Sequence, residues 1–266
     1  MFLVYVPPYG QRQYYTTFDA WLWYNCRVKQ VIPTIPAFEP DARLLGLVHR
    51  LKSDFSDIVI VNDGSHRADA VFAELKDVDG VLVLLHGENR GKGAALKTAF
   101  AEILRRFPDA VGTVTVDADG QHRPEDAVRI AEALCAHPHQ LIIGTRSFGK
   151  GVPFRSRLGN LWTVAEFRLL TGRTVHDTQT GLRGIPSGLL PSLLNLPGER
   201  YDYEIGMLVR AVLSSDGCRE IPIETVYEDG NRASHFRPLA DTVSTQRALF
   251  RAALTARFGW RSHALR

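Results

Sequence analysis

The chain has 266 residues, of which 45% are hydrophobic and 23% charged, a composition typical of a globular protein. Its formal net charge of +3 is too small to indicate a nucleic-acid-binding protein, so we expect no nucleic-acid partner. The three cysteines are far apart and lack metal-ligand spacing, which favours buried thiols over a disulfide framework. No apolar run approaches the ~18–20 residues of a membrane span, and the first residues lack the core and basic leader of a signal peptide. These features predict a cytoplasmic protein.

Apolar strand-like runs alternate with longer helical patterns over the central part of the chain. We expect strands at residues 28–32, 57–61, 81–85, 111–116 and 140–144, and helices at residues 41–52, 68–76, 93–107 and 124–137. Short strands that alternate with helices of this length form parallel sheets with crossover helices. The pattern therefore predicts an α/β domain with a mostly parallel sheet flanked by helices. After residue 144 it is looser, with helices expected at 158–170 and 203–213, a loop at 174–184 and a strand at 219–226.

Two terminal segments differ from this central domain, which we place at residues 28–240. Residues 1–27 form an extension rich in Tyr and Trp, which could cap the domain, form an interface or have no fold of its own. Residues 241–266 contain five arginines and one acidic residue. The tail is open to two interpretations, because its arginines do not form a clean face opposite its apolar residues. It could attach weakly to an anionic membrane, or it could be a packed helix whose arginines reach solvent.

Three polar clusters follow strands of the expected sheet. They comprise residues 63–65, 88–93 and 117–122. Ligands of an open parallel sheet bind outside the carboxyl ends of its strands, so we expect the three clusters to converge at one edge. Their convergence is stronger evidence of a site than any one motif.

Asp117 and Asp119 leave a strand end at positions i and i+2, so their carboxylates can turn toward one point. Hard oxygen ligands beside a diphosphate select Mg²⁺ or Mn²⁺. Such a cation would neutralise the charge on a departing nucleoside diphosphate. A solvated turn is the alternative, since Asp and Gly are ordinary turn residues. The buried strand before the pair and residues 121–125 after it favour a metal site.

The other two clusters give weaker signals when each is taken alone. Asp63 is a candidate to accept hydrogen bonds from a ribose or a base, or it closes its strand with an Asx-turn. Residues 91–93 at a helix start could bring backbone N–H groups and the Lys92 ammonium near phosphates. They resemble a shortened dinucleotide fingerprint, but Leu96 stands where the third glycine belongs. That departure argues against a nicotinamide-dependent enzyme.

The ordered series of these motifs resembles the family 2 glycosyltransferases. Within them it is most similar to the dolichyl-phosphate mannose synthase group, which includes bacterial polyprenyl-phosphate glycosyltransferases. The resemblance is carried by residues 36–38, 61–65, 89–95, 117–122, 144–146 and 177–183, and it spans roughly residues 28–235. It implies a GT-A fold with a single nucleotide-sugar-binding domain, a nucleoside-diphosphate sugar donor and inversion at the anomeric carbon.

The resemblance also implies roles for individual residues. Metal ligands are implied at Asp117, Asp119 and Gln121, a nucleoside contact at Asp63 and an acceptor-phosphate contact at Arg146. Asp117, Asp119 and Arg146 are thus the predicted catalytic residues. Further donor-binding residues are expected at Pro36, Phe38, Glu39, Lys92 and Ala118.

Two segments depart from the family pattern. The family has Tyr-Asn-Glu where this chain has Phe38-Glu39-Pro40, so the usual nucleoside-contacting Glu is displaced or absent. The family's later basic segment is also altered here, at residues 229–235.

The predicted reaction moves a hexose from a nucleotide sugar to a polyprenyl phosphate. A phosphate monoester has a second pKa near ~6, so it is already an oxyanion nucleophile at neutral pH and needs no general base. Such an acceptor requires a clamp of cations, for which the candidates are Arg146, Arg183, Arg155 and Arg157. A hydroxyl acceptor would instead need a base, and Asp177 or Glu204 is the candidate for that alternative mechanism.

A lipid-phosphate acceptor would place the protein at the inner face of the membrane as a peripheral protein, with or without a membrane partner protein. Outside enzymes, the competing hypothesis is a carbohydrate- or nucleotide-binding domain, which fits the displaced Glu but not the intact metal motif. A nucleotidyltransferase would want a glycine loop rich in Arg or Lys at the first strand, and residues 33–40 do not supply one.

Overall fold

A computed structural model describes residues 28–146, 154–214, 216–224 and 246–251, with the backbone alone for residues 154–161. The extension at residues 1–27, most of the tail and the segment 229–235 lie outside the described residues. The strands are β1 (Val31–Ala37), β2 (Ile58–Asn62), β3 (Val81–Leu85), β4 (Gly112–Thr115), β5 (Leu141–Arg146), β6 (Arg183–Pro186) and β7 (Cys218–Ile223). The α-helices are α2 (Arg43–Leu51), α3 (Asp69–Lys76), α4 (Lys92–Arg106), α5 (Pro124–Ala136), α6 (Phe154–Thr171), α7 (Leu190–Leu194) and α8 (Tyr201–Val212).

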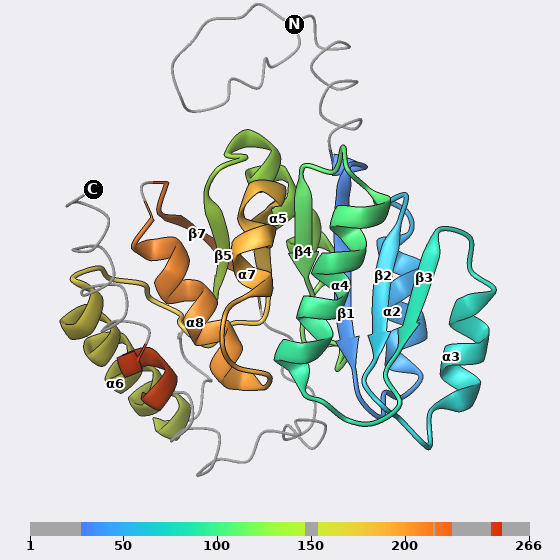
Figure 1. The fold of residues 1–266 in the computed structure, drawn as a ribbon, viewed down its shortest axis with the longest axis horizontal. Helices are drawn as coiled ribbons and strands as arrows, with labels where there is room; N and C mark the ends of the chain where they lie inside the picture. Colours follow the sequence, from blue (N-terminus) through green and yellow to red (C-terminus); the bar gives the residue numbers. More distant parts are fainter. Residues whose placement is uncertain (1–27, 147–153, 215, 225–245, 252–266) are drawn as a thin grey trace, which may run out of the picture.

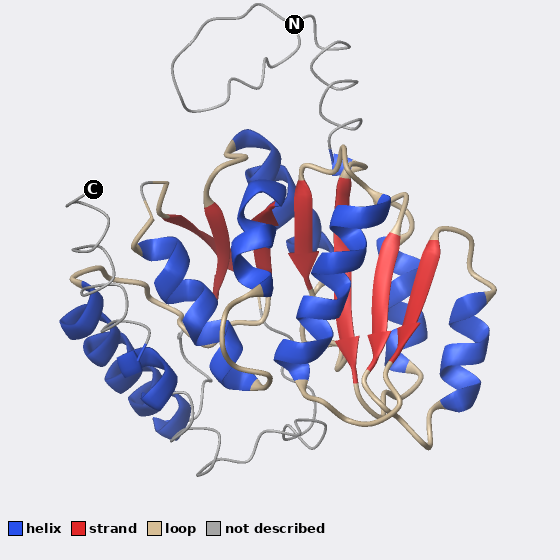
Figure 2. Ribbon diagram, in the orientation of Figure 1, coloured by secondary structure: helices blue, strands red, loops and turns tan. Residues whose placement is uncertain are grey.

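The described strands form one sheet in the order β3-β2-β1-β4-β6-β5-β7. Strand β6 runs antiparallel to both of its neighbours, and every other pair is parallel. The sheet lies in the middle of the domain with helices on both sides (Figure 2). The predicted α/β class with a mostly parallel, helix-flanked sheet is confirmed.

Two apolar clusters, one on each face of the sheet, hold the layers together. On one face, α2 packs through Leu44, Leu47 and Leu51, whose i, i+3, i+7 spacing gives the helix a single apolar side. On the other face, Phe100 of α4 and Leu208 of α8 are fully buried in a second cluster. Figure 1 shows α4, α7 and α8 in front of the sheet and α2 behind it. The loops at the carboxyl ends of β1, β2 and β4 thus emerge beside the first turns of α4 and α8.

The first strand differs from the predicted one, because it begins at Val31 and continues to Ala37. Pro33 and Pro36 lie inside it, in register with Val114 of β4 and Val61 of β2. Proline removes a ladder hydrogen bond and is uncommon inside a central strand, and the predicted strand ended at residue 32. The strand is buried between two partners along most of its length, and this burial outweighs the two missing N–H donors.

Strand β6 occupies a position where the sequence predicted the end of a loop. It has four residues, two of which are Gly184 and Pro186, so it carries no strand signal. Its place is set by close packing, since a Cβ on Gly112 of β4 would lie 2.2 Å from the Ile185 carbonyl oxygen.

Among the described helices, none has the length and apolarity needed to cross a bilayer.

Candidate functional site

A cleft of about 570 Å³ opens at the carboxyl ends of β1, β2 and β4. Its lining includes most of the residues predicted to bind the donor or a metal, namely Pro36, Phe38, Glu39, Asp63, Lys92, Asp117, Ala118 and Asp119. The predicted convergence of three loop clusters is therefore present. Gln121, Arg146 and Arg183 do not belong to this lining.

Residues that the sequence did not single out complete the cleft. Arg200 and Tyr201 reach it from the start of α8. No local signal marks them, because their position depends on how α8 packs against α4. The contact is close, since a Cβ on Gly93 would lie 2.5 Å from Cβ of Tyr203.

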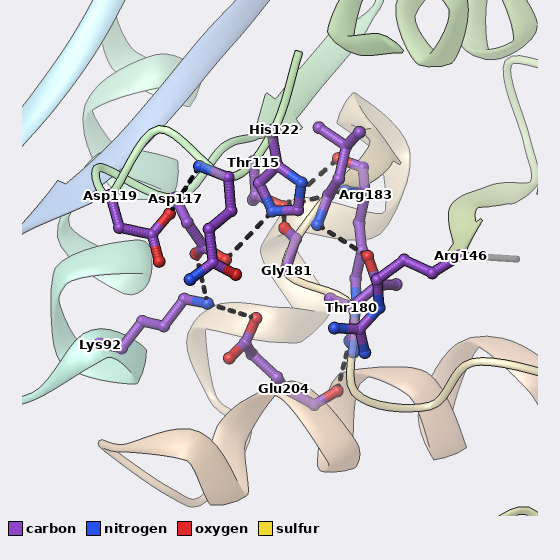
Figure 3. Close-up of polar contacts among 12 residues, drawn as sticks. Lys92, Thr115, Asp117, Asp119, His122, Arg146, Thr180, Gly181, Arg183 and Glu204 are labelled. Atoms are coloured by element: carbon purple, nitrogen blue, oxygen red, sulfur yellow. Dashed lines mark hydrogen bonds and ion pairs between the residues drawn. The ribbon is translucent and has the colours of Figure 1, made fainter. Parts of the chain in front are cut away.

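Asp117 lies at the centre of a network of charges just beyond β4 (Figure 3). Its Oδ1 pairs with Nζ of Lys92 at 2.7 Å, and its Oδ2 lies 3.1 Å from Nε2 of His122. Burial alone would raise the pKa of Asp117, but Lys92 and His122 hold that pKa well below its usual range. Lys92 also pairs with Oε1 of Glu204 at 3.0 Å. Burial opposes the charge on Lys92, yet the two carboxylates raise its pKa above the ordinary value. Asp117 is accordingly an anion at neutral pH.

The loop before β6 packs directly on Asp117. A Cβ on Gly181 would lie only 2.3 Å from Oδ2 of Asp117 and 2.7 Å from its Oδ1, so no larger residue fits there. The hydroxyl of Thr115, the last residue of β4, donates to the Gly181 carbonyl at 2.6 Å and fixes the approach. The sequence analysis included Gly181 only within the family motif at residues 177–183 and gave it no role of its own.

Asp119 lies at the edge of the same cleft, and its Oδ1 accepts the backbone N–H of Gln121 at 3.0 Å. Burial is the main cause that raises the pKa of Asp119, and the negative charge of Asp117 raises it further. The charge of Asp117 disfavours the ionisation of Asp119, so a bound cation would stabilise the pair, and their hard oxygens suit Mg²⁺ or Mn²⁺. The donor set therefore fits such a cation. Within the described residues, no group of three or more His, Cys, Asp or Glu side chains is arranged to hold a metal ion.

Arg183 has a different position from the one the motif implied. Its side chain is 1% exposed and donates to the backbone carbonyls of Thr180, Glu204 and Thr178 at 3.0, 2.5 and 3.2 Å. These bonds tie the loop before β6 to helix α8. The predicted role as an acceptor-phosphate clamp finds no support for Arg183, because its guanidinium is enclosed by main chain.

Arg146, at the end of β5, forms a bidentate pair with Asp177. Its Nε lies 2.6 Å from Oδ2 and its Nη2 3.0 Å from Oδ1 of the fully buried carboxylate. Arg146 keeps 22% of its side chain exposed, whereas Arg183 is buried. The side chains of Arg155 and Arg157, the other predicted clamp residues, lie outside the described part of the structure.

The two carboxylates predicted as alternative general bases are thus both paired with cations. Asp177 is fully buried against Arg146, and its Oδ1 also accepts the N–H of Gln179. Glu204 is 8% exposed and pairs with Lys92.

Asp63 follows β2 and organises the neighbouring loop. Its Oδ1 accepts from His86 Nδ1 at 2.7 Å and from Arg90 N at 3.0 Å, while its Oδ2 accepts Gly91 N at 2.7 Å. Glu39 acts similarly on the loop after β2, since its carboxylate accepts the N–H groups of His66 and Arg67. Both side chains line the cleft while holding its walls.

Residues 91–93 allow close helix packing in addition to any contact with a ligand. Gly91 has φ 101°, and a Cβ there would lie 2.5 Å from the Glu199 carbonyl oxygen. The N–H of Ala94 donates to the same carbonyl at 3.0 Å. The sequence predicted that backbone N–H groups of this segment face phosphates. The N–H of Gly91 instead donates to Oδ2 of Asp63.

A mostly parallel α/β sheet, with a cleft and a carboxylate pair beyond the ends of its strands, is the arrangement expected of a GT-A-like domain. A sequence model described as glycosyl transferase family 2 matches residues 34–190, and the chain belongs to this family of enzymes. The resemblance predicted from the motifs is thereby confirmed.

Proteins of known name support this assignment. The chain is 27% identical over 227 residues to the UDP-N-acetylglucosamine–dolichyl-phosphate N-acetylglucosaminyltransferase of Methanococcus voltae, a match that covers 77% of this chain and 89% of the relative. It is 30% identical over 206 residues to the polyprenol monophosphomannose synthase of Mycolicibacterium smegmatis, covering 74% of this chain and 76% of the relative. The crystal structure of glucosyl-3-phosphoglycerate synthase from M. tuberculosis shares the fold, with a TM-score of 0.61, 19% identity and coverage of 88% and 85%.

Proposed function

We propose that the protein transfers a hexose from a nucleoside-diphosphate sugar to a polyprenyl phosphate, with inversion at the anomeric carbon. An oxygen of the lipid phosphate attacks the anomeric carbon, and the bond from that carbon to the diphosphate oxygen breaks. The nucleoside diphosphate leaves, and a sugar phosphodiester of the lipid remains. No proton has to be removed from the nucleophile, because the phosphate monoester is already an anion.

The proposal of a phosphate acceptor rests on the ion pairs formed by the two candidate bases, Asp177 and Glu204. A hydroxyl acceptor needs a carboxylate that can take up a proton, whereas Asp177 and Glu204 are held by Arg146 and Lys92. Asp177 is also fully buried, and neither carboxylate lines the cleft. An acceptor that brings its own charged oxygen fits this arrangement. The names of two relatives, which act on dolichyl phosphate and form polyprenol monophosphomannose, support the same acceptor class.

The donor is proposed to bind in the cleft beyond β1, β2 and β4. Asp117 and Asp119 would hold Mg²⁺ or Mn²⁺ there, with Gln121 beside them as implied by the family motif. The cation supplies Lewis-acid neutralisation of the leaving diphosphate. Pro36, Phe38 and Ala118 line the same cleft and provide the apolar walls that a nucleoside requires.

The acceptor phosphate is proposed to meet Arg146. Its bidentate pair with Asp177 fixes the direction of the guanidinium, and its partial exposure leaves it within reach of a ligand. A phosphate held by a preoriented arginine loses less entropy on reaching the attacking position. We further propose that the enzyme works at a membrane surface, where such a lipid resides.

The experiment compares two lipids that differ only in the nucleophile. The full chain is incubated with a panel of nucleotide sugars and either polyprenyl phosphate or polyprenol, with Mn²⁺ or with a chelator. We expect transfer with one or two donors, to polyprenyl phosphate alone and only in the presence of the metal. Equal transfer to polyprenol would contradict the phosphate nucleophile and favour a hydroxyl acceptor with a general base. Undiminished transfer in chelator would contradict the role of the metal.

A further inference from the structure

We infer that Lys92 is a built-in counter-ion that holds Asp117 while no divalent cation is bound, and that Glu204 is the positioning residue that receives Lys92 when one binds. The inference rests on the proposed function, because it takes Asp117 and Asp119 as metal ligands. It goes further by assigning to Lys92 and Glu204 the control of metal affinity, in place of a phosphate contact and a general base.

The geometry places one ammonium between two carboxylates from different elements. Lys92 opens α4, Asp117 follows β4 and Glu204 lies in the first turn of α8. The ammonium is 2.7 Å from Asp117 and 3.0 Å from Glu204, and the three side chains are 17%, 28% and 11% exposed. Figure 3 shows the Lys92 side chain reaching between the two acids, with Asp119 on the side of Asp117. The ammonium therefore neutralises the same carboxylate that would ligate a metal.

The charges at this point allow one of two arrangements. Without a second cation, the carboxylates of Asp117 and Glu204 need Lys92 between them, because like charges in a partly buried site destabilise one another. A divalent cation on Asp117 would repel an ammonium bonded to the same oxygen. Lys92 can withdraw from Asp117 without losing every partner, since Glu204 already accepts one of its three donors. The ammonium stays paired in both arrangements.

The surrounding packing lets the tip of Lys92 move while its base and Glu204 stay fixed. The N–H of Ala94 donates to the Glu199 carbonyl, which holds the first turn of α4 against the start of α8. The backbone carbonyl of Glu204 accepts from the buried guanidinium of Arg183 at 2.5 Å. Lysine suits this role, because its charge sits at the end of a flexible four-carbon stem.

This arrangement predicts opposite effects of the two residues on metal affinity. Removing Lys92 removes a competitor, so the metal should bind more tightly. Removing the charge of Glu204 leaves Lys92 with Asp117 alone, so the metal should bind more weakly. Coupling of this kind is typically about 5- to 150-fold, and we expect changes of about tenfold.

The test is direct titration of Mn²⁺ into the full chain, without donor or acceptor, by calorimetry. We expect Lys92→Met to bind Mn²⁺ about tenfold more tightly than the wild type and Glu204→Gln about tenfold more weakly. Arg105→Met is the matched control, since it removes a positive charge from an exposed side chain of the same helix and should leave the affinity unchanged. Circular dichroism checks that each variant is folded.

The double variant Lys92→Met/Glu204→Gln separates competition from the general influence of charge. If Glu204 acts only through Lys92, the double variant should bind Mn²⁺ as tightly as Lys92→Met. If both residues act as independent charges, gain and loss cancel and the double variant should resemble the wild type, which would overturn the inference. The double variant also removes both partners of one ion pair, so it serves if Lys92→Met alone does not fold.

The failure of the proposed function gives a different result. If the wild type binds no Mn²⁺, or if Asp119→Ala binds it equally well, the metal site itself is wrong and the inference falls with it. If Asp119→Ala loses binding while Lys92→Met and Glu204→Gln change it in the same direction, the metal site stands and only the exchange of Lys92 is refuted.

Discussion

Replacing Arg183 by methionine should destabilise the protein strongly, although the sequence motif suggested a role in substrate binding. Its guanidinium donates to three carbonyls at 3.0, 2.5 and 3.2 Å and is 1% exposed. Methionine fills a similar volume but has no donor. The three carbonyls would therefore remain buried without their partner, and the loop before β6 would lose its connection to α8.

The expected magnitude follows from these three bonds. A hydrogen bond from a charged donor contributes about 1.5–3 kcal/mol, which gives a gross loss of about 4.5–9 kcal/mol for three. The variant also avoids the burial of a cation, a cost seen in the lowered pKa of Arg183, which burial causes. That cost amounts to several kcal/mol per ion, so we expect a net loss of about 3–5 kcal/mol.

Urea unfolding followed by circular dichroism measures the change, and Arg210→Met on the exposed side of α8 is the control. The control should change the free energy of unfolding by less than about 0.5 kcal/mol. The reasoning would be refuted if Arg183→Met unfolded at the wild-type urea concentration while its KM for polyprenyl phosphate rose. That result would return Arg183 to the acceptor site.

Three further predictions concern the metal site and the tail. Gly181→Ala should lower the transfer rate at least about a hundredfold, since its Cβ would displace Asp117, and a normal rate in the folded variant would contradict the packing. Because the pKa of Asp119 is raised, the folded state holds the proton of this carboxyl more tightly than the unfolded state does. Asp119 therefore contributes stability below pH 3.8, its ordinary pKa, and that contribution is lost as the pH rises through the raised pKa. Asp119→Asn should therefore unfold no more easily than metal-free wild type at pH 7 while losing Mn²⁺-dependent transfer, and a marked loss of stability would refute this. Replacing the arginines of residues 252–266 by glutamine should weaken sedimentation with anionic vesicles, by about 1 kcal/mol for each residue at the surface, and unchanged binding would leave the tail without this role.

The layered architecture was predictable because alternating strands and helices of these lengths permit few arrangements. The first strand was misplaced because Pro33 and Pro36 resemble a strand break when neighbours on both sides are unknown. Strand β6 was missed because its four residues have no apolar alternation, and its place is set by Gly112 and Gly184, which permit close packing. The bounds of β1 and the presence of β6 both depend on pairing with strands that are distant in sequence, which the local pattern does not show.

The position of the cleft was predictable from the rule that ligands bind at the carboxyl ends of parallel strands. The alternation of strands and helices already predicted the direction of the strands before Asp63 and Asp117 and of the helix that begins at Lys92. The surroundings of Arg183 were not predictable, because its strand runs antiparallel and had not been recognised. The direction of a side chain depends on the register of its strand, so the motif gave the residue without its orientation.

The three basic side chains around the site are distinguished by their partners. Lys92 pairs with Asp117 and Glu204, Arg146 pairs with the buried Asp177, and Arg183 donates to carbonyl oxygens of the main chain. Lys92 can release Asp117 to a bound cation at little cost, because Glu204 keeps its ammonium paired. Arg146 cannot release Asp177 in the same way, since that carboxylate is fully buried and would lose its cation. A buried guanidinium bonded to main chain has no such second state, since withdrawing it leaves three carbonyls unsatisfied. We therefore place ligand-dependent movement at Lys92, and we assign to Arg146 and Arg183 fixed positions that do not depend on the ligand.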